Sequence, residues 1–112
     1  MSDIKRAIGS ALGEIEGAEA FFYYPQSFAR LPCVSFYEAA NVPAAGADDR
    51  AYAAEIVYAV DVWAETDAQA EGVAAHVAEK MGGLGFAREF SCDMYDPGSD
   101  VRHKAMRFKT IR

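Results

Sequence analysis

The stretch 51-AYAAEIVYAVDVWAE-65 decides the fold, because it alternates between two kinds of position over its whole length. Its even-numbered residues are all apolar or aromatic: Tyr52, Ala54, Ile56, Tyr58, Val60, Val62 and Ala64. Its odd-numbered residues mix acids with apolar side chains: Glu55, Val57, Ala59, Asp61, Trp63 and Glu65. A period of two predicts a long β-strand with one face buried in a core. The other face is half apolar and carries a tryptophan, which indicates a contact surface.

A helix signal begins immediately after this strand. Thr66 and Gln69 have the spacing of a capping box, and Gly82 follows the last apolar residue. Between these ends the apolar side chains recur at helical spacing: Ala70, Val73, Ala74, Val77 and Met81. A second stripe of this kind lies near the N-terminus: Ile4, Ile8, Leu12 and Ile15. The two stripes predict two amphipathic helices, the first of about four turns and ending before Gly17.

Four further segments have the composition of strands: Ala20–Tyr24, Leu31–Glu38, Phe86–Tyr95 and Arg102–Ile111. The first is strongly aromatic and is stopped by Pro25, whereas the other three alternate between two faces. In the last strand we expect Met106 and Phe108 to be buried. Residues 39–50 are small and polar, with Pro43 and Gly46, and are predicted to form a loop before the long strand.

These elements follow one another in the order helix, three strands, helix, two strands (αβββαββ). Short connections between consecutive strands favour antiparallel pairing, and helices with a single apolar stripe cover one face of a sheet. The sequence therefore predicts an α+β fold with a mostly antiparallel sheet of about five strands and two helices on one face. A chain of 112 residues has the size of a single domain, 1–112.

Composition excludes several classes of protein. The net charge of −6 argues against a sequence-independent grip on nucleic acid, which requires clustered lysine and arginine. The chain contains no apolar run long enough to span a membrane, and charges interrupt the N-terminal segment where a secretion signal would be apolar. We expect Cys33 and Cys92 to be buried free thiols of a cytosolic protein.

No set of residues with the spacing of a catalytic or metal site stands out, and no cofactor is expected. His76 flanks the apolar stripe of the second helix, and His103 begins the last strand, where we expect it to be solvated. Neither histidine has an evident nucleophile and orienting carboxylate in the sequence. The glycines of Gly82–Gly85 follow a helix, so they terminate it and do not cradle a phosphate. We therefore predict that the chain is not an enzyme.

The order of these segments resembles a known protein family. An amphipathic N-terminal helix leads to the aromatic stretch FFYYPQSFARLPCVSFYE, and the long strand YAVDVWAE runs into a helix that ends near Gly82. A final hairpin carries the basic strand RHKAMRFKTI. This arrangement resembles the small tail-completion, or tail-terminator, proteins of long-tailed bacteriophages and prophages, of the lambda tail-terminator type. The resemblance extends over nearly the whole chain and consists of pattern and spacing.

The resemblance implies a structural role in the neck of the virion, after assembly in the cytoplasm of the bacterial host. Such proteins form a ring, a hexamer, that stops polymerisation of the tail tube and offers a surface to the head connector. The implied partners are other copies of the chain, the major tail tube protein and the head–tail connector. DNA would pass through the ring only as cargo. The family fold is α+β with helices on one side of the sheet, as the residues indicate independently.

The residues that we expect at the subunit interface combine an aromatic anchor with opposite charges: Trp63, Glu55, Asp61, Glu65, Arg107, Lys109, Asp48, Asp49 and Arg50. The acids of the long strand and the bases of the last strand would pair either across the sheet or between subunits. Two alternatives remain open, namely another neck component, such as a head-closure or minor capsid protein, and a small α+β ligand-binding module.

Overall fold

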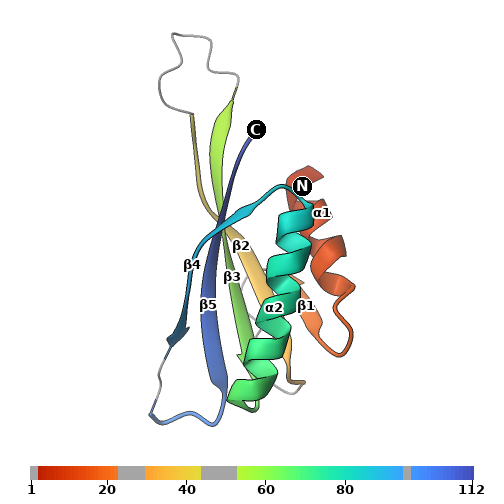
Figure 1. The fold of residues 1–112 in the computed structure, drawn as a ribbon, viewed down its shortest axis with the longest axis vertical. Coiled ribbons are helices and arrows are strands. Elements are labelled where there is room, and N and C mark those ends of the chain that lie inside the picture. The colour runs from red at the N-terminus through yellow and green to blue at the C-terminus, as the bar shows by residue number, and fades with distance from the viewer. Residues whose placement is uncertain (1–2, 23–29, 44–52, 95–96) are drawn as a thin grey trace.

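The computed structural model describes residues 3–22, 30–43, 53–94 and 97–112. The elements are α1 (Asp3–Gly13), β1 (Glu19–Phe22), β2 (Cys33–Pro43), β3 (Ala54–Ala64), α2 (Asp67–Gly83), β4 (Ala87–Met94) and β5 (Arg102–Ile111). The five strands form one sheet in the order β1-β2-β3-β5-β4, and α1 and α2 lie side by side on one face of it (Figure 1). The predicted α+β class and the order αβββαββ are confirmed.

Three of the four strand pairs are antiparallel, and the pair β1–β2 is parallel. In the parallel pair Glu19 lies beside Cys33 and Phe22 lies beside Phe36. β5 inserts between β3 and β4, so β4 runs in the same direction as β3 but does not touch it. The expectation that consecutive strands pair antiparallel is therefore wrong for β1 and β2, although the sheet is mostly antiparallel as predicted.

The core lies between the sheet and the two helices. Tyr58, Val60 and Val62, the even-numbered residues of β3, are fully buried on the helix side. They meet Leu12 of α1 and Val77 of α2, together with further apolar side chains of one contiguous cluster: Ile8, Ile15, Val34, Phe36, Ile56, Met81, Phe86, Met106 and Phe108. Period-two strands and 3.6-period helices thus contribute the apolar faces that the sequence predicts.

Two boundary differences matter for the fold. β2 continues to Pro43, so residues 39–43, which were predicted to lie in a loop, pair with the first residues of β3 after a bulge between Glu38 and Ala40. The end of β2 and the start of β3, together with the end of β5, run past the ends of the helices as an extension of the sheet that we call the arm (Figure 1). α1 ends at Gly13, and Ile15 is nevertheless buried beyond the helix end. The rest of the predicted loop, residues 44–50, lies outside the described residues.

The N-terminus of α2 is fixed as the sequence predicts. The Oγ1 atom of Thr66 accepts a hydrogen bond of 3.1 Å from the backbone N–H of Gln69. The Oε1 atom of Gln69 in turn accepts one of 2.8 Å from the backbone N–H of Glu65. Side chains thereby satisfy donors that the first helical turn leaves free, and α2 begins directly at the end of the central strand.

A buried lysine joins three elements on the helix side of the sheet. Lys104 of β5 is 7% exposed, and its Nζ atom lies 3.0 Å from Oε1 of Glu71 in α2 and 2.9 Å from Oδ1 of Asp93 in β4. Hydrogen bonds with Asp93, and then with Glu71, raise the pKa of Lys104 above its ordinary value. Lys104 therefore holds the edge strand β4 and the helix α2 to β5.

Replacement of this lysine tests its contribution to stability. We expect Lys104→Ala to lower the free energy of unfolding by about 1–2 kcal/mol, because charge-assisted hydrogen bonds are lost while the two carboxylates remain hydrated. Chemical denaturation at pH 7 measures the loss, and Lys80→Ala, which removes an exposed lysine paired with Glu14, is the control with a smaller expected effect.

The contribution of Lys104 to stability has a predicted pH dependence. Since the folded-state pKa of Lys104 is raised, its contribution is fully present below the ordinary pKa of 10.5 and declines as the pH rises through the folded-state value. On the alkaline side of pH 7, the difference in stability between the wild type and Lys104→Ala should therefore shrink only at strongly alkaline pH. A difference that shrinks between pH 6 and pH 8 would contradict this assignment.

Candidate functional site

The sheet surface opposite α1 and α2, which we call the helix-free face, carries the odd-numbered residues of β3. The registers place Ser35 of β2 and Ala105 of β5 on either side of Asp61, and Cys33 and His103 on either side of Trp63. The strand on which the fold depends therefore also supplies the centre of the second surface.

Four polar and aromatic side chains form a cluster at the centre of this face, which we call the central cluster: Ser35, Asp61, Trp63 and His103. The Nε2 atom of His103 lies 2.7 Å from Oδ1 of Asp61, so the imidazole donates to the carboxylate when its proton is on Nε2. The ring of Trp63 stacks on the imidazole at 3.7 Å between centroids and 15° between planes. The Nε1 atom of Trp63 donates a hydrogen bond of 3.1 Å to Oγ of Ser35.

Much of the central cluster is buried, although His103 also lines a surface depression of 460 Å³ together with Met94 and Arg102. Ser35 is fully buried, Asp61 is 2% exposed, and 19% of the His103 side chain is accessible. Catalysis by a histidine and a carboxylate requires a reacting group within reach of the imidazole. Here the indole covers one face of the imidazole, and the Ser35 hydroxyl accepts a hydrogen bond from that indole. This arrangement is that of a packed structural pair.

One atom of the cluster lacks a partner. Oδ2 of Asp61 is buried and accepts no hydrogen bond from the described residues. A buried carboxylate oxygen without a donor costs about 1–3 kcal/mol or more, so the contact with His103 must offset part of the burial of Asp61. The prediction that His103 is a solvated strand end with no orienting carboxylate is therefore wrong. Sequence reasoning missed the pair because the β3–β5 register brings together residues 42 positions apart.

The predicted alternation of acids and bases leads to pairing across the sheet within one chain. The Nζ atom of Lys109 lies 3.3 Å from Oε1 of Glu55 in β3 and 3.6 Å from Oε2 of Glu89 in β4. The hydrogen bond with Glu55, followed by the charges of Glu55 and Glu89, raises the pKa of Lys109. Asp61 pairs with His103 and is buried, so within one chain it does not present an exposed acid to a neighbour.

The other residues predicted at an interface occupy different places. Trp63 is half-buried and belongs to the central cluster. Arg107 is half-buried, with its guanidinium 5.8 Å from the ring centroid of Phe90. Glu65 is exposed at the junction of β3 and α2. Asp48, Asp49 and Arg50 lie outside the described residues, as do Tyr23 and Tyr24 of the predicted first strand.

The two cysteines have opposite surroundings. Cys33 is fully buried, and desolvation together with the charge of Glu19 raises its pKa to about 11. Cys92 is exposed on β4, and both thiols are free. The expectation of two buried thiols is correct for Cys33 and wrong for Cys92, because β4 is an edge strand with every residue exposed.

Sequence reasoning missed a group of exposed apolar side chains. Phe90 and Met94 of β4 are 47% and 50% exposed, and both lie on the helix-free face, in register with Arg107 and His103. Val42 and Ile111, at the end of the sheet that bears the arm, are 49% and 61% exposed. The alternation of residues 86–94 signalled a strand with an apolar face, but it did not reveal that nothing in the described chain covers that face.

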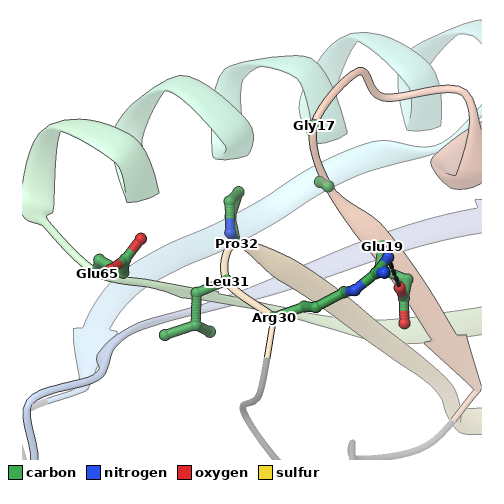
Figure 2. A pocket seen from close by; sticks show the side chains of 7 residues that line it. Gly17, Glu19, Arg30, Leu31, Pro32 and Glu65 are labelled. Carbon is green, nitrogen blue, oxygen red and sulfur yellow. Dashed lines mark hydrogen bonds and ion pairs between the residues drawn. The ribbon is translucent and has the colours of Figure 1, made fainter.

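A surface depression lies at the opposite end of the sheet from the arm. It has a volume of 580 Å³ and is lined by Gly17, Ala18, Glu19, Arg30, Leu31, Pro32 and Glu65. Figure 2 shows Arg30 and Glu19 on one side and Glu65 on the other. Arg30 and Glu19 form an ion pair of 3.4 Å with each other, and both side chains are largely in solvent. Because Arg30 and Glu19 already pair with each other in solvent, they offer a charged ligand little binding energy.

Metal and membrane chemistry have no evident site in the described part of the chain. None of its histidines, cysteines or acids gather in groups of three suited to hold a metal ion. None of its helices is both long enough and apolar enough to cross a bilayer. The features of the described surface that stand out are therefore the central cluster and the exposed apolar side chains of the helix-free face.

Comparison with known proteins gives no relative: no protein-family model matches the chain, and neither does any curated protein sequence.

A double-mutant cycle tests whether Asp61 and His103 act as a structural pair. Asp61→Asn removes the charge, His103→Phe keeps a ring under Trp63, and the double variant removes both partners. We expect a coupling energy of about 0.5–3 kcal/mol in the free energy of unfolding. The partly exposed pair Glu55 and Lys109 serves as the control with a weaker expected coupling. Additivity of the Asp61 and His103 changes would show that the 2.7 Å contact contributes nothing to folding.

Proposed function

We propose that the chain is a tail-terminator protein of a long-tailed bacteriophage or prophage. In this proposal its copies form a ring, expected to be a hexamer, that caps the tail tube, ends tube polymerisation and offers the joining surface to the head. Assembly takes place in the cytoplasm of the bacterial host, and the protein then resides in the neck of the virion. The proposal rests on the sequence resemblance and on the surface features described above.

The observation that carries the proposal is the exposed apolar surface on the helix-free face. Phe90, Met94 and Ile111 expose about half or more of their area, although a core of ample size is available on the other side of the sheet. Exposed large apolar side chains that gather on one surface mark contacts with other proteins. A structural subunit of an assembly requires such a surface, whereas an isolated globular protein does not.

The arm supports the same role. Every residue of β2 from Glu38 to Pro43 is exposed, although the segment is regular strand paired with β3. An exposed outer strand of this kind gains stability when it lies against a neighbouring subunit or the tube. A ring also requires two different complementary surfaces on each subunit, and the arm and the β4 margin lie on different parts of the sheet (Figure 1).

Charge and the central cluster are consistent with this role. A net charge of −6 favours a channel through which DNA passes without adhering. The Asp61–His103 pair is largely buried and its imidazole stacks on Trp63, which favours a role in stiffening the sheet over a role in catalysis. A rigid sheet is what an assembly interface requires, because ordering of the interface then costs less on binding.

The test is a tube-capping assay with the major tail tube protein encoded in the same genome. Tubes polymerise from the purified tube protein in the presence of increasing amounts of the chain. We expect mean tube length to fall with increasing ratio and one end of each tube to carry a ring, both measured by negative-stain electron microscopy. An unrelated acidic protein of similar size is the control. Unchanged tube lengths and bare tube ends at saturating chain would contradict the proposal.

A further inference from the structure

The edge strand β4 is unusually open. Within the described residues it pairs only with β5, so the backbone groups along its outer margin lack a strand partner. All eight residues from Ala87 to Met94 are exposed, and β4 contributes no side chain to the buried core. Figure 1 shows β4 along the margin of the sheet farthest from α1. Natural proteins normally protect such a margin, because it templates pairing with another chain.

The charges of β4 do little to protect it. Glu89 is held by Lys109 and Asp93 by Lys104, both from the neighbouring strand β5. These contacts hold the two acids against lysines of the same chain, so the acids repel an approaching strand less than carboxylates without a partner would. The helix-free side of β4 presents Phe90, Cys92 and Met94 in a row, since these residues pair with Arg107, Ala105 and His103.

Symmetry restricts how two such margins can pair. A two-fold axis perpendicular to the sheet makes the two β4 strands antiparallel and keeps both helix-free faces on the same side. Opposed residues must then point to the same face. Because side chains alternate, the axis has to pass through a residue and not between two residues. Each possible register is therefore named by the residue at its centre.

Of the four centres from Phe90 to Asp93, only one suits the side chains of β4. An axis at Ser91 requires Glu89 to oppose Asp93 of the second copy, although Glu89 lies with Lys109 on the helix-free face and Asp93 lies with Lys104 on the helix side, because of the irregularity between Arg88 and Phe90. An axis at Asp93 places two aspartates, which are like charges, opposite each other. An axis at Phe90 leaves Met94 outside the ladder and includes the irregularity between Arg88 and Phe90. An axis at Cys92 places Phe90 opposite Met94 of the second copy, twice, and opposes no like charges.

We propose that β4 of one copy pairs antiparallel with β4 of a second copy about a two-fold axis at Cys92. The pairing joins two five-stranded sheets into one of ten strands and covers the two most exposed apolar side chains of β4, Phe90 and Met94, with each other. The partner that pairs with the outer margin of β4 is thus a second copy of this chain. The free chain in solution is a dimer.

This pairing has a consequence that rests on the proposed ring function. A ring at the end of a tube has different upper and lower sides, so it contains no two-fold axis in its plane, whereas the β4 pair requires one between its two copies. The dimer must therefore open before its copies enter the ring. Pairing through β4 would hold the chain in a form that does not close into rings away from the tube.

The native cysteine provides a direct test. At the proposed axis the two Cys92 Cα atoms are opposed, at about 4.5–5.5 Å, which is within the range that a disulfide spans. Mild oxidation of the full chain with diamide should give a covalent dimer within minutes, read on a non-reducing gel. Cys92→Ser should abolish the covalent dimer, and Cys33→Ala, which removes the buried thiol, should retain it. Sedimentation equilibrium of the reduced wild type should give the mass of a dimer.

Two variants separate pairing from chance collision of exposed thiols. Phe90→Asp places a carboxylate opposite Met94 of the second copy and should reduce the rate of cross-linking at least tenfold and give a monomer by sedimentation. His76→Asp, on an exposed position of α2, should change neither result. A monomeric wild type, or equal cross-linking rates in the wild type and Phe90→Asp, would overturn the proposal. No tube protein is present, so these results are independent of the tube-capping assay.

Discussion

The structure depends on the fact that its central strand is buried on both faces although helices cover only one of them. Tyr58, Val60 and Val62 face α1 and α2, and Ala59 and Asp61 on the opposite face are as inaccessible as the core. A strand alternates strictly, so position 61 faces away from the helices, and Asp61 is nevertheless buried there, between Ser35 of β2 and Ala105 of β5. The contact with His103 offsets part of the cost of burying Asp61, and it joins β3 to β5. Trp63 of β3 stacks on His103 and donates a hydrogen bond to Ser35, which joins β3 to β2.

The centre of the sheet is firmly packed, whereas β4 and the arm bury little surface. The central cluster and the apolar core fix three strands, whereas β4 relies on backbone pairing, on the contacts of Lys104 and Lys109, and on the stacking of Arg107 with Phe90. The arm beyond Glu38 is likewise exposed. Regions with few buried contacts open most readily, and they are the regions that assembly proteins use for exchangeable contacts. The proposed functions of β4 and the arm follow from this distribution of burial.

The local patterns predicted most of the fold. The alternation of residues 51–65, the helical stripe after Thr66 and the final strand Arg102–Ile111 were recognisable because each pattern is local and complete. The direction of β1 and the extension of β2 to Pro43 were not, because both depend on pairing with distant residues. The central cluster was missed for the same reason. Asp61 and His103 were each visible as single residues, but only the β3–β5 register places them in contact.

The central claim is that the helix-free face and the β4 margin are contact surfaces, while the outer face of the helices remains in water. Hydrogen–deuterium exchange tests it most directly, by comparing the free chain, diluted until it is monomeric, with the chain bound at the ends of tail tubes. The account predicts slower exchange on binding for amides of residues 87–94 and of the arm, with unchanged exchange for the exposed residues of α2. Protection confined to α1 and α2, with β4 and the arm unchanged, would contradict it.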